Sequence, residues 1–185
     1  MLKPYLIAVT GRPGAGKSTF AHALGQRAFL PVISRDEIKE GYVHTFGKSH
    51  AELPEGANAE ATRLFFDAAE RLLDGGVSLI AEAAFQHKLW TPWLESMKCR
   101  ARIILMICQA GDGSVELERF VQRGLENPLR EYFHGDKGVD MARRGLTVKA
   151  GPYEPPHLDV PTYSIDTAGE YHPSIEQLLH EIFGW

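Results

Sequence analysis

An eight-residue run near the amino terminus, Gly11-Arg12-Pro13-Gly14-Ala15-Gly16-Lys17-Ser18, constrains the fold of this chain more than any other feature. It fits the pattern G-x-x-x-x-G-K-[ST]. An apolar run at 5–9 predicts a buried strand before it, and apolar residues at helical spacing predict a helix over 17–28. Glycines let such a loop wrap closely, so that its N–H groups point inward at an anion beside the positive end of the helix. A chance match in a glycine-rich turn would lack this frame, so we predict a loop that binds the phosphates of a nucleotide.

The side chains that follow the glycines favour a triphosphate with a metal ion. Lys17 is expected to reach the β- and γ-phosphates, and the hydroxyl of Ser18 to enter the Mg²⁺ shell. Thr19 is expected to contact the α-phosphate. The chain has no N-K-x-D stretch of the kind that reads guanine, so ATP is the expected nucleotide and Mg²⁺ the expected cofactor.

Apolar runs alternate with amphipathic stretches along the rest of the chain. Further strands are predicted at 30–33, 77–81, 102–108 and 161–166, and helices at 36–42 (begun by Ser34), 59–73, 114–125 and the carboxyl terminus. This alternation predicts an α/β fold with five parallel strands covered by helices on both faces. From Asn127 to His157 no period is visible, which is typical of a functional lid. We expect one domain, 1–185, with a mobile lid at about 124–157.

The composition limits the classes of molecule that the protein is expected to bind. The net charge is −4 and no basic stripe is visible, which argues against a long nucleic acid and favours a small substrate. No apolar run approaches the roughly 18 residues that a membrane span requires, so we expect a cytoplasmic protein that does not enter a membrane. Cys99 and Cys108 are interpreted as reduced thiols. No feature predicts an oligomeric state.

The segment at 34–39, Ser-Arg-Asp-Glu-Ile-Lys, supplies a candidate general base. It follows the second predicted strand, and the carboxyl ends of strands line the ligand crevice of open α/β sheets. Asp36 could there accept the proton of a hydroxyl that attacks the γ-phosphate. Alternatively, Asp36 caps the next helix from its first turn.

The loop and this segment together resemble the small P-loop kinases grouped around polynucleotide kinase, zeta toxin and chloramphenicol phosphotransferase. The resemblance implies a three-layer P-loop NTPase fold and kinase activity. In polynucleotide kinases the Asp of the matching Arg-Asp pair is the general base, which corresponds to Asp36. A basic residue three positions later holds the phosphate next to the acceptor hydroxyl, which corresponds to Lys39. Lysine lacks the planar guanidinium with which arginine binds a phosphate through two hydrogen bonds. This departure from the family pattern weakens the prediction that the acceptor is the 5′ end of a nucleic acid.

Glu82 ends the third predicted strand as an isolated carboxylate in an apolar run. Relatives commonly carry Asp or Glu there, where it orients Mg²⁺ through water or contacts the acceptor. Burying an unpaired carboxylate is costly, which supports a function. The alternative is a structural partner of Lys17 or of a neighbouring arginine.

Two arginines, Arg119 and Arg123, lie four residues apart on one predicted helix face just before the lid. Kinases of this type supply lid arginines that spread the charge of the transferring phosphoryl group. The family's Arg-Gly at the lid boundary matches Arg123-Gly124, so Arg123 is the candidate. Arg119 could serve equally or contact the adenine side, and either could belong to a solvated face. Weaker lid candidates are Arg130, Arg143 and Arg144.

Other residues carry little signal. The histidines His44, His50 and His134 lack metal-ligand spacing and are interpreted as ordinary surface or pocket residues. Trp90 and Trp93 are interpreted as packing residues rather than as a stacking platform.

The leading hypothesis is therefore a phosphotransferase that moves the γ-phosphate of ATP to a hydroxyl of a small molecule. Within enzymes, the alternatives are a 5′-polynucleotide or nucleoside kinase and a toxin-like kinase acting on cell-wall precursors. A different class is a nucleotide-dependent switch or regulatory ATPase with a protein partner. Such a switch normally has an apolar strand that ends in Asp, the Walker B strand, and here only Glu82 is available.

Overall fold

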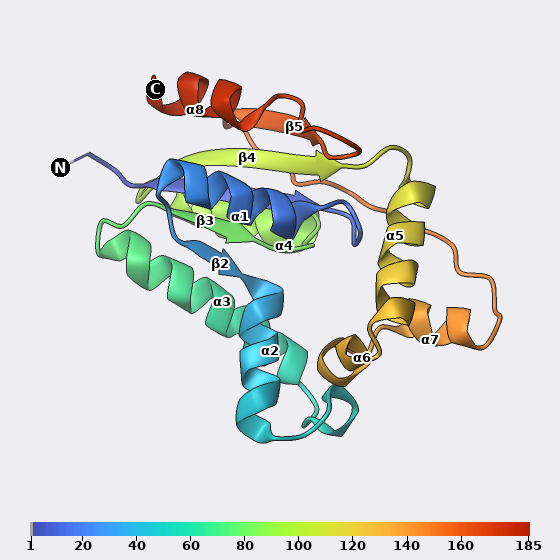
Figure 1. The fold of residues 1–185 in the computed structure, drawn as a ribbon. Coiled ribbons are helices and arrows are strands. Elements are labelled where there is room, and N and C mark those ends of the chain that lie inside the picture. The colour runs from blue at the N-terminus through green and yellow to red at the C-terminus, as the bar shows by residue number, and fades with distance from the viewer. Residues whose placement is uncertain (1) are drawn as a thin grey trace.

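The computed structural model describes residues 2–185 and contains one sheet between two layers of helices (Figure 1). All strand pairs are parallel, and the order across the sheet is β2-β3-β1-β4-β5. The strands are β1 (Tyr5–Gly11), β2 (Val32–Ser34), β3 (Leu79–Glu82), β4 (Arg102–Gln109) and β5 (Thr162–Asp166). The predicted five-stranded parallel sheet is confirmed.

Helices cover both faces of the sheet and gather beyond the carboxyl ends of its strands. They are α1 (Lys17–Ala28), α2 (Arg35–Phe46), α3 (Ala57–Asp74), α4 (His87–Met97), α5 (Gly113–Glu126), α6 (Leu129–His134), α7 (Lys137–Arg143) and α8 (Ile175–Phe183), with a 3₁₀ turn at His50–Glu52. Capping explains two of the starts, because Asp112 accepts from the N–H of Ser114 before α5 and Ser174 forms a capping box with Gln177 before α8.

Successive side chains of the central strands pack alternately into two separate hydrophobic cores, one on each face of the sheet. Leu6 and Ala8 of β1 pack in one core with α3 and α4, whereas Ile7 and Val9 pack in the other with α1 and α8. Because successive side chains of a strand point to opposite faces, a strand that is apolar on both faces over residues 6–9 must lie between two layers. Burial of both faces fixes β1 at the centre of the sheet and therefore fixes the loop that follows it.

The segment between α5 and β5, predicted as a lid without regular structure, contains two short helices. It contains α6 and α7, and then a strap at 144–161 that has no regular structure and returns the chain to β5. Figure 1 shows α6 and α7 on the same side of the molecule as α2, beyond the carboxyl ends of the strands. These two helices have 6 and 7 residues, too few for a helical period to stand out in the sequence.

Two further expectations are corrected in detail. The helix predicted at 36–42 begins at Arg35 and continues to Phe46, and the Ser34 side chain makes no capping bond to it. A helix not predicted from the sequence, α4, follows Glu82; it runs through Pro92 and buries Trp90 completely. The interpretation of Trp90 and Trp93 as packing residues is confirmed, since both belong to the core beneath α3.

Within residues 2–185, no helix is both long enough and apolar enough to span a bilayer. Both cysteines are free thiols, and burial raises the pKa of the Cys108 thiol to about 12.

Candidate active site

The loop at 11–18 wraps between β1 and α1 in a conformation that depends on glycine. Gly14 and Gly16 have φ angles of 87° and 71°, in the left-handed region that other residues rarely adopt. A Cβ atom on Gly14 would lie 1.9 Å from the main-chain oxygen of Glu116. The loop is also held from behind, because the Thr167 hydroxyl donates to the main-chain oxygen of Ala15 at 2.8 Å.

Lys17 is buried at the start of α1, and its ammonium donates to the main-chain oxygen of Arg12 at 3.0 Å. Burial lowers the pKa of Lys17, while the carboxylates of Glu82 and Asp36 oppose that shift. The lysine is therefore a desolvated cation inside the loop, where an anionic phosphate would restore its charge balance.

Glu82 lies at the end of β3 beside both neighbouring strands and is 3% exposed. Its Oε2 accepts a hydrogen bond from the Ser34 hydroxyl at 2.7 Å, and the Ser18 hydroxyl is near enough to the carboxylate to favour its charged form. Burial raises the pKa of Glu82, and the nearby Lys17 ammonium works against that shift. The structural alternative considered for Glu82 thus has a physical basis, but the carboxylate also reaches the residue expected to bind the metal.

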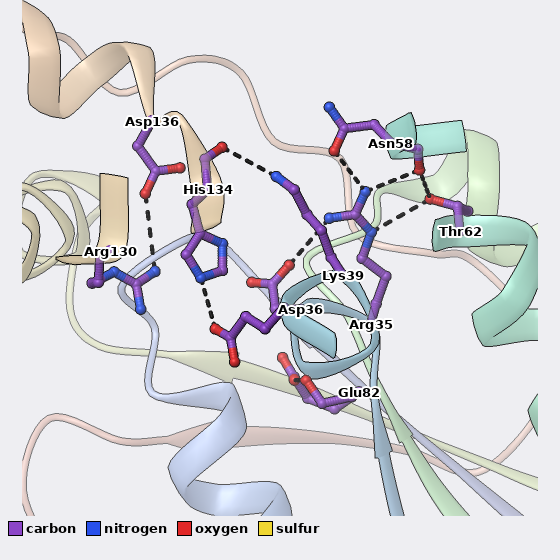
Figure 2. Close-up of polar contacts among 11 residues, drawn as sticks. Arg35, Asp36, Lys39, Asn58, Thr62, Glu82, Arg130, His134 and Asp136 are labelled. Atoms are coloured by element: carbon purple, nitrogen blue, oxygen red, sulfur yellow. Dashed lines mark hydrogen bonds and ion pairs between the residues drawn. The ribbon is translucent and has the colours of Figure 1, made fainter. Parts of the chain in front are cut away.

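Asp36 lies in the first turn of α2, and its Oδ1 is 3.3 Å from Nη1 of Arg35. Burial raises the pKa of Asp36, but the charges of His134, Arg35 and Lys17 outweigh burial and hold that pKa below its ordinary value. The carboxyl is therefore ionised at neutral pH and able to accept a proton. Figure 2 shows the Arg35 guanidinium between Asp36 on one side and Asn58 and Thr62 on the other, with contacts to all three.

The lid helices close the opposite wall of the site. Lys39 of α2 is 5% exposed, and its ammonium donates to the main-chain oxygen of His134 at 3.1 Å (Figure 2). Burial and the charge of Arg35 lower the pKa of Lys39. Arg130 of α6 lies 3.9 Å from Asp136, and its Nε is buried with no hydrogen-bond partner in residues 2–185.

These elements enclose one cleft of about 390 Å³ between the loop, α2 and the lid helices. Predicted site residues on its wall are Pro13, Gly14, Gly16, Lys17, Ser18, Thr19, Asp36, Lys39 and Arg123. The wall also includes residues given little or no weight from the sequence, namely Ser34, Arg35, Glu37, Glu40, Ala84, Phe120, Arg130, His134 and Asp136. The fold therefore brings the predicted phosphate loop, base and lid arginine together, while their roles stay predictions.

The other predicted residues lie outside the wall of the cleft. Gly11 and Ala15 are buried in the loop backbone, and Glu82 lies behind Ser18 and Ser34. Arg119 donates to the main-chain oxygens of Thr167 and Ala168 at 3.4 and 3.1 Å, after β5. Of the weaker lid candidates, Arg143 pairs with Glu131 and Arg144 pairs with Asp140, whereas Arg130 reaches the cleft.

Arg12 points out of the loop and joins it to the strap. Its Nη1 donates to the main-chain oxygen of Gly151 at 2.6 Å, and its Nε lies 3.6 Å from buried Glu116. The guanidinium also lies over the ring of Tyr153, whose hydroxyl is 3.2 Å from the Thr10 hydroxyl. The strap is thus fastened directly to the phosphate loop.

The fold and the loop identify the class. A parallel sheet in the order β2-β3-β1-β4-β5, with this glycine-rich loop after its central strand and helices on both faces, defines a small P-loop kinase with the P-loop NTPase fold. The chain belongs to the AAA_33 family of AAA domains, whose model matches residues 6–143.

Comparison with individual proteins agrees with this class. Adenylyl-sulfate kinase from Geotalea daltonii is 27% identical over 164 residues, which are 80% of this chain and 79% of that protein. The crystal structure of a candidate kinase from Chloroflexus aurantiacus is 26% identical and covers 98% of this chain and 97% of its own, with a TM-score of 0.77. The APS kinase from Mycobacterium tuberculosis, solved in complex with AMPPNP and APS, is 17% identical and covers 100% and 98% of the two chains with a TM-score of 0.61, which shows the fold alone.

Proposed function

We propose that this protein transfers the γ-phosphate of ATP to a hydroxyl group of a small polar acceptor. The observation that carries the proposal is the shared cleft, in which Lys17, Asp36 and Arg123 line one space of about 390 Å³. A phosphate-binding lysine, an ionised carboxylate and an arginine are the groups that phosphoryl transfer to a hydroxyl requires.

The polarity of the cleft supports a small polar acceptor. Phe120 contributes the one benzene ring among the described residues that line it, and most other wall residues are charged or hydroxylated. Nucleic-acid bases are often bound by stacking on several large aromatic rings, and Phe120 is the one phenylalanine, tyrosine or tryptophan among the described residues of this wall. The 5′-polynucleotide kinase alternative therefore receives no support from the cleft.

Each residue then has a distinct task. The N–H groups of the loop and the ammonium of Lys17 hold the phosphates, for which Lys17 exchanges its bond to the Arg12 oxygen. Asp36 accepts the proton of the acceptor hydroxyl as that oxygen attacks the γ-phosphorus and the bond to the bridging oxygen of ADP breaks. Arg123 balances the negative charge of the transferring group, and α6 limits access of water to the cleft.

The residues at the loop fit a magnesium ion shared with the phosphates. No group of three or more metal-binding side chains occurs within residues 2–185, so the protein by itself offers no complete cage. The Ser18 hydroxyl with the buried Glu82 carboxylate behind it is an all-oxygen donor set of the kind that Mg²⁺ prefers when phosphate oxygens complete its shell. Ser18 would hold the ion and Glu82 would orient its water, and the bound ion would neutralise charge on the phosphates.

The test is acceptor-dependent release of ADP from MgATP. A panel of hydroxyl-bearing metabolites, antibiotics and 5′-hydroxyl oligonucleotides is screened, with Lys17→Ala as the control that lacks phosphate binding. We expect slow hydrolysis without an acceptor and faster ADP release with a small polar acceptor, since transfer of the phosphoryl group to water is suppressed when the cleft excludes water. ATP turnover that responds only to a protein partner would instead indicate a regulatory ATPase.

A further inference from the structure

A carboxylate–imidazole pair, with a buried histidine and a partly exposed glutamate, joins the lid to α2 beside the candidate base. His134 is the last residue of α6 and is 8% exposed, and its Nε2 lies 2.7 Å from Oε1 of Glu40. The main-chain oxygen of the same histidine accepts the bond from Lys39. Lys39 and Glu40, consecutive residues of α2, therefore hold both the main chain and the ring of His134 in place, unlike a histidine that is free in solvent.

The bond to Glu40 fixes the chemistry of the other ring nitrogen. A carboxylate only accepts hydrogen bonds, so Nε2 must carry the proton that is shared with Glu40. In the neutral ring the lone pair then lies on Nδ1, which has no hydrogen-bond partner within residues 2–185. A carboxylate that orients an imidazole in this way turns the free nitrogen into a directed hydrogen-bond acceptor.

The imidazole belongs to the acceptor side of the cleft. His134, Glu40 and Asp36 all line the same cleft, and Figure 2 shows His134 beside Asp36 and Lys39. An acceptor molecule that places one hydroxyl at Asp36 must therefore occupy the space next to His134.

We propose that His134 is an acceptor-binding residue, and that its Nδ1 accepts a hydrogen bond from a second hydroxyl of the phosphate acceptor. The substrate class is then a polyhydroxylated small molecule such as a sugar, a sugar acid or a cyclitol. One hydroxyl reacts at Asp36 and its neighbour is held by His134, while Glu40 acts as a positioning residue through the imidazole. This inference rests on the proposed kinase function, which supplies the reacting hydroxyl.

Binding is tested by NMR on the full chain with ¹⁵N-labelled histidine, saturated with Mg·AMPPNP at about pH 8, above the usual imidazole range. The probes are D-glucose, D-gluconate and myo-inositol, extended to further hexoses, pentoses, sugar acids and cyclitols. The variant His134→Gln identifies the His134 signals. We expect the Nε2–H tautomer before any probe is added, and an upfield shift of Nδ1 when a polyhydroxylated probe binds. An Nδ1–H tautomer, or a panel in which no polyol moves this signal, would overturn the inference.

Two variants separate hydroxyl binding from lid attachment. In His134→Gln the amide can still donate to Glu40, but no acceptor remains at the Nδ1 position, so the probe that shifts wild type should bind about tenfold more weakly. His134→Asn places an oxygen near Nδ1 without reaching Glu40 and should restore part of that affinity. His44→Ala is the matched control, because it removes a different contact between α2 and the lid, the packing of His44 on Phe133. Equal losses in His134→Gln and His44→Ala would make His134 a structural residue.

The outcome also separates this inference from the kinase proposal. A polyol that shifts Nδ1 and binds more weakly to His134→Gln, yet never accelerates ADP release from MgATP, would leave the binding role intact and overturn the proposed reaction. Conversely, rapid phosphorylation of ethanolamine, which has one hydroxyl, with no effect of His134→Gln would support a kinase and overturn the role of His134.

Discussion

The hydroxyl of Ser34 donates a hydrogen bond to the buried carboxylate of Glu82, with 2.7 Å between Oγ and Oε2. The two residues are register partners at the ends of β2 and β3, and Glu82 is also the register partner of Val9 in β1. This one bond therefore joins β2, which leads into the helix of the candidate base, to β3, which pairs with the strand that precedes the phosphate loop. It also explains why Ser34 does not cap α2, since its hydroxyl is already committed to Glu82.

Replacing Glu82 by Gln should change how stability depends on pH. Burial raises the folded-state pKa of Glu82 above its ordinary value of 4.5, so the folded protein holds this proton at a pH where the unfolded chain has lost it. Stability linked to this group is therefore lost as the pH rises from about 4.5 through the raised pKa. We expect wild type to lose free energy of unfolding relative to Glu82→Gln over that window, measured by urea denaturation without nucleotide.

Magnesium dependence gives the same variant a second readout. If Glu82 orients the water of a bound ion, Glu82→Gln should need more Mg²⁺ for half-maximal ADP release while AMPPNP affinity without metal stays unchanged. An unaltered Mg²⁺ requirement would make Glu82 a purely structural partner of Lys17 and Ser34.

Asp36→Asn should abolish acceptor-dependent turnover, because an amide cannot take up the proton of the attacking hydroxyl. General-base assistance is worth ~10²–10⁴-fold, and we expect a loss in that range. The affinity for Mg·AMPPNP should stay within a few-fold, as measured by calorimetry, because Asp36 lies on α2 rather than in the loop. Near-normal phosphorylation by the variant would exclude Asp36 as the base.

Arg123→Ala and Arg119→Ala form a matched pair on α5. Arg123 lines the cleft, whereas Arg119 donates to main-chain oxygens after β5. Loss of a group that stabilises transition-state charge costs about 10²–10³-fold in kcat, which we expect for Arg123→Ala under saturating substrates. Arg119→Ala should leave kcat much less affected. The reverse order of effects would assign the lid role to Arg119.

Gly14→Ala should destabilise the protein, because its Cβ would lie 1.9 Å from the oxygen of Glu116 at a φ of 87°. A strained left-handed residue costs ~1–3 kcal/mol even without the clash. Gly41→Ala is the control, since the exposed Gly41 lies in α2 with no atom within 4 Å of the added methyl group. Alanine in a helix is favoured over glycine, so that variant should gain ~0.5–1 kcal/mol in thermal denaturation. A neutral Gly14→Ala would show that the loop has another stable conformation.

The sheet and the phosphate loop could be predicted because their signals are local. Strands buried on both faces are continuous apolar runs, and the loop motif requires both a strand and a helix beside it. The short α6 and α7 show no comparable hydrophobic periodicity. The lid could therefore be located as the segment without a pattern, but its helices could not be predicted. In α4, Pro92 interrupts the pattern and conceals a helix whose tryptophans are held by the aromatic core.

The acceptor side was harder to predict because it depends on contacts between distant parts of the chain. The Lys39–His134 and Glu40–His134 contacts join residues more than 90 positions apart, and no local pattern marks His134 as part of a site. Arg119 and Arg123 show the converse difficulty. They share one helix face, but four residues advance a helix by about 6 Å, enough to place one at the cleft and the other beyond β5.

The position of β1 in the middle of the sheet gives the molecule two working sides. β3 and β2 lie on one flank and carry Asp36 with its helix, while β4 and β5 lie on the other and lead to Thr167 behind the loop. Under the proposed function, the acceptor side of the cleft belongs to the β2 flank and the phosphate loop lies above the central strand. The proposed function then predicts that substitutions on the β2 flank alter the choice of acceptor, while the phosphate loop after β1 and its support by Thr167 stay unchanged.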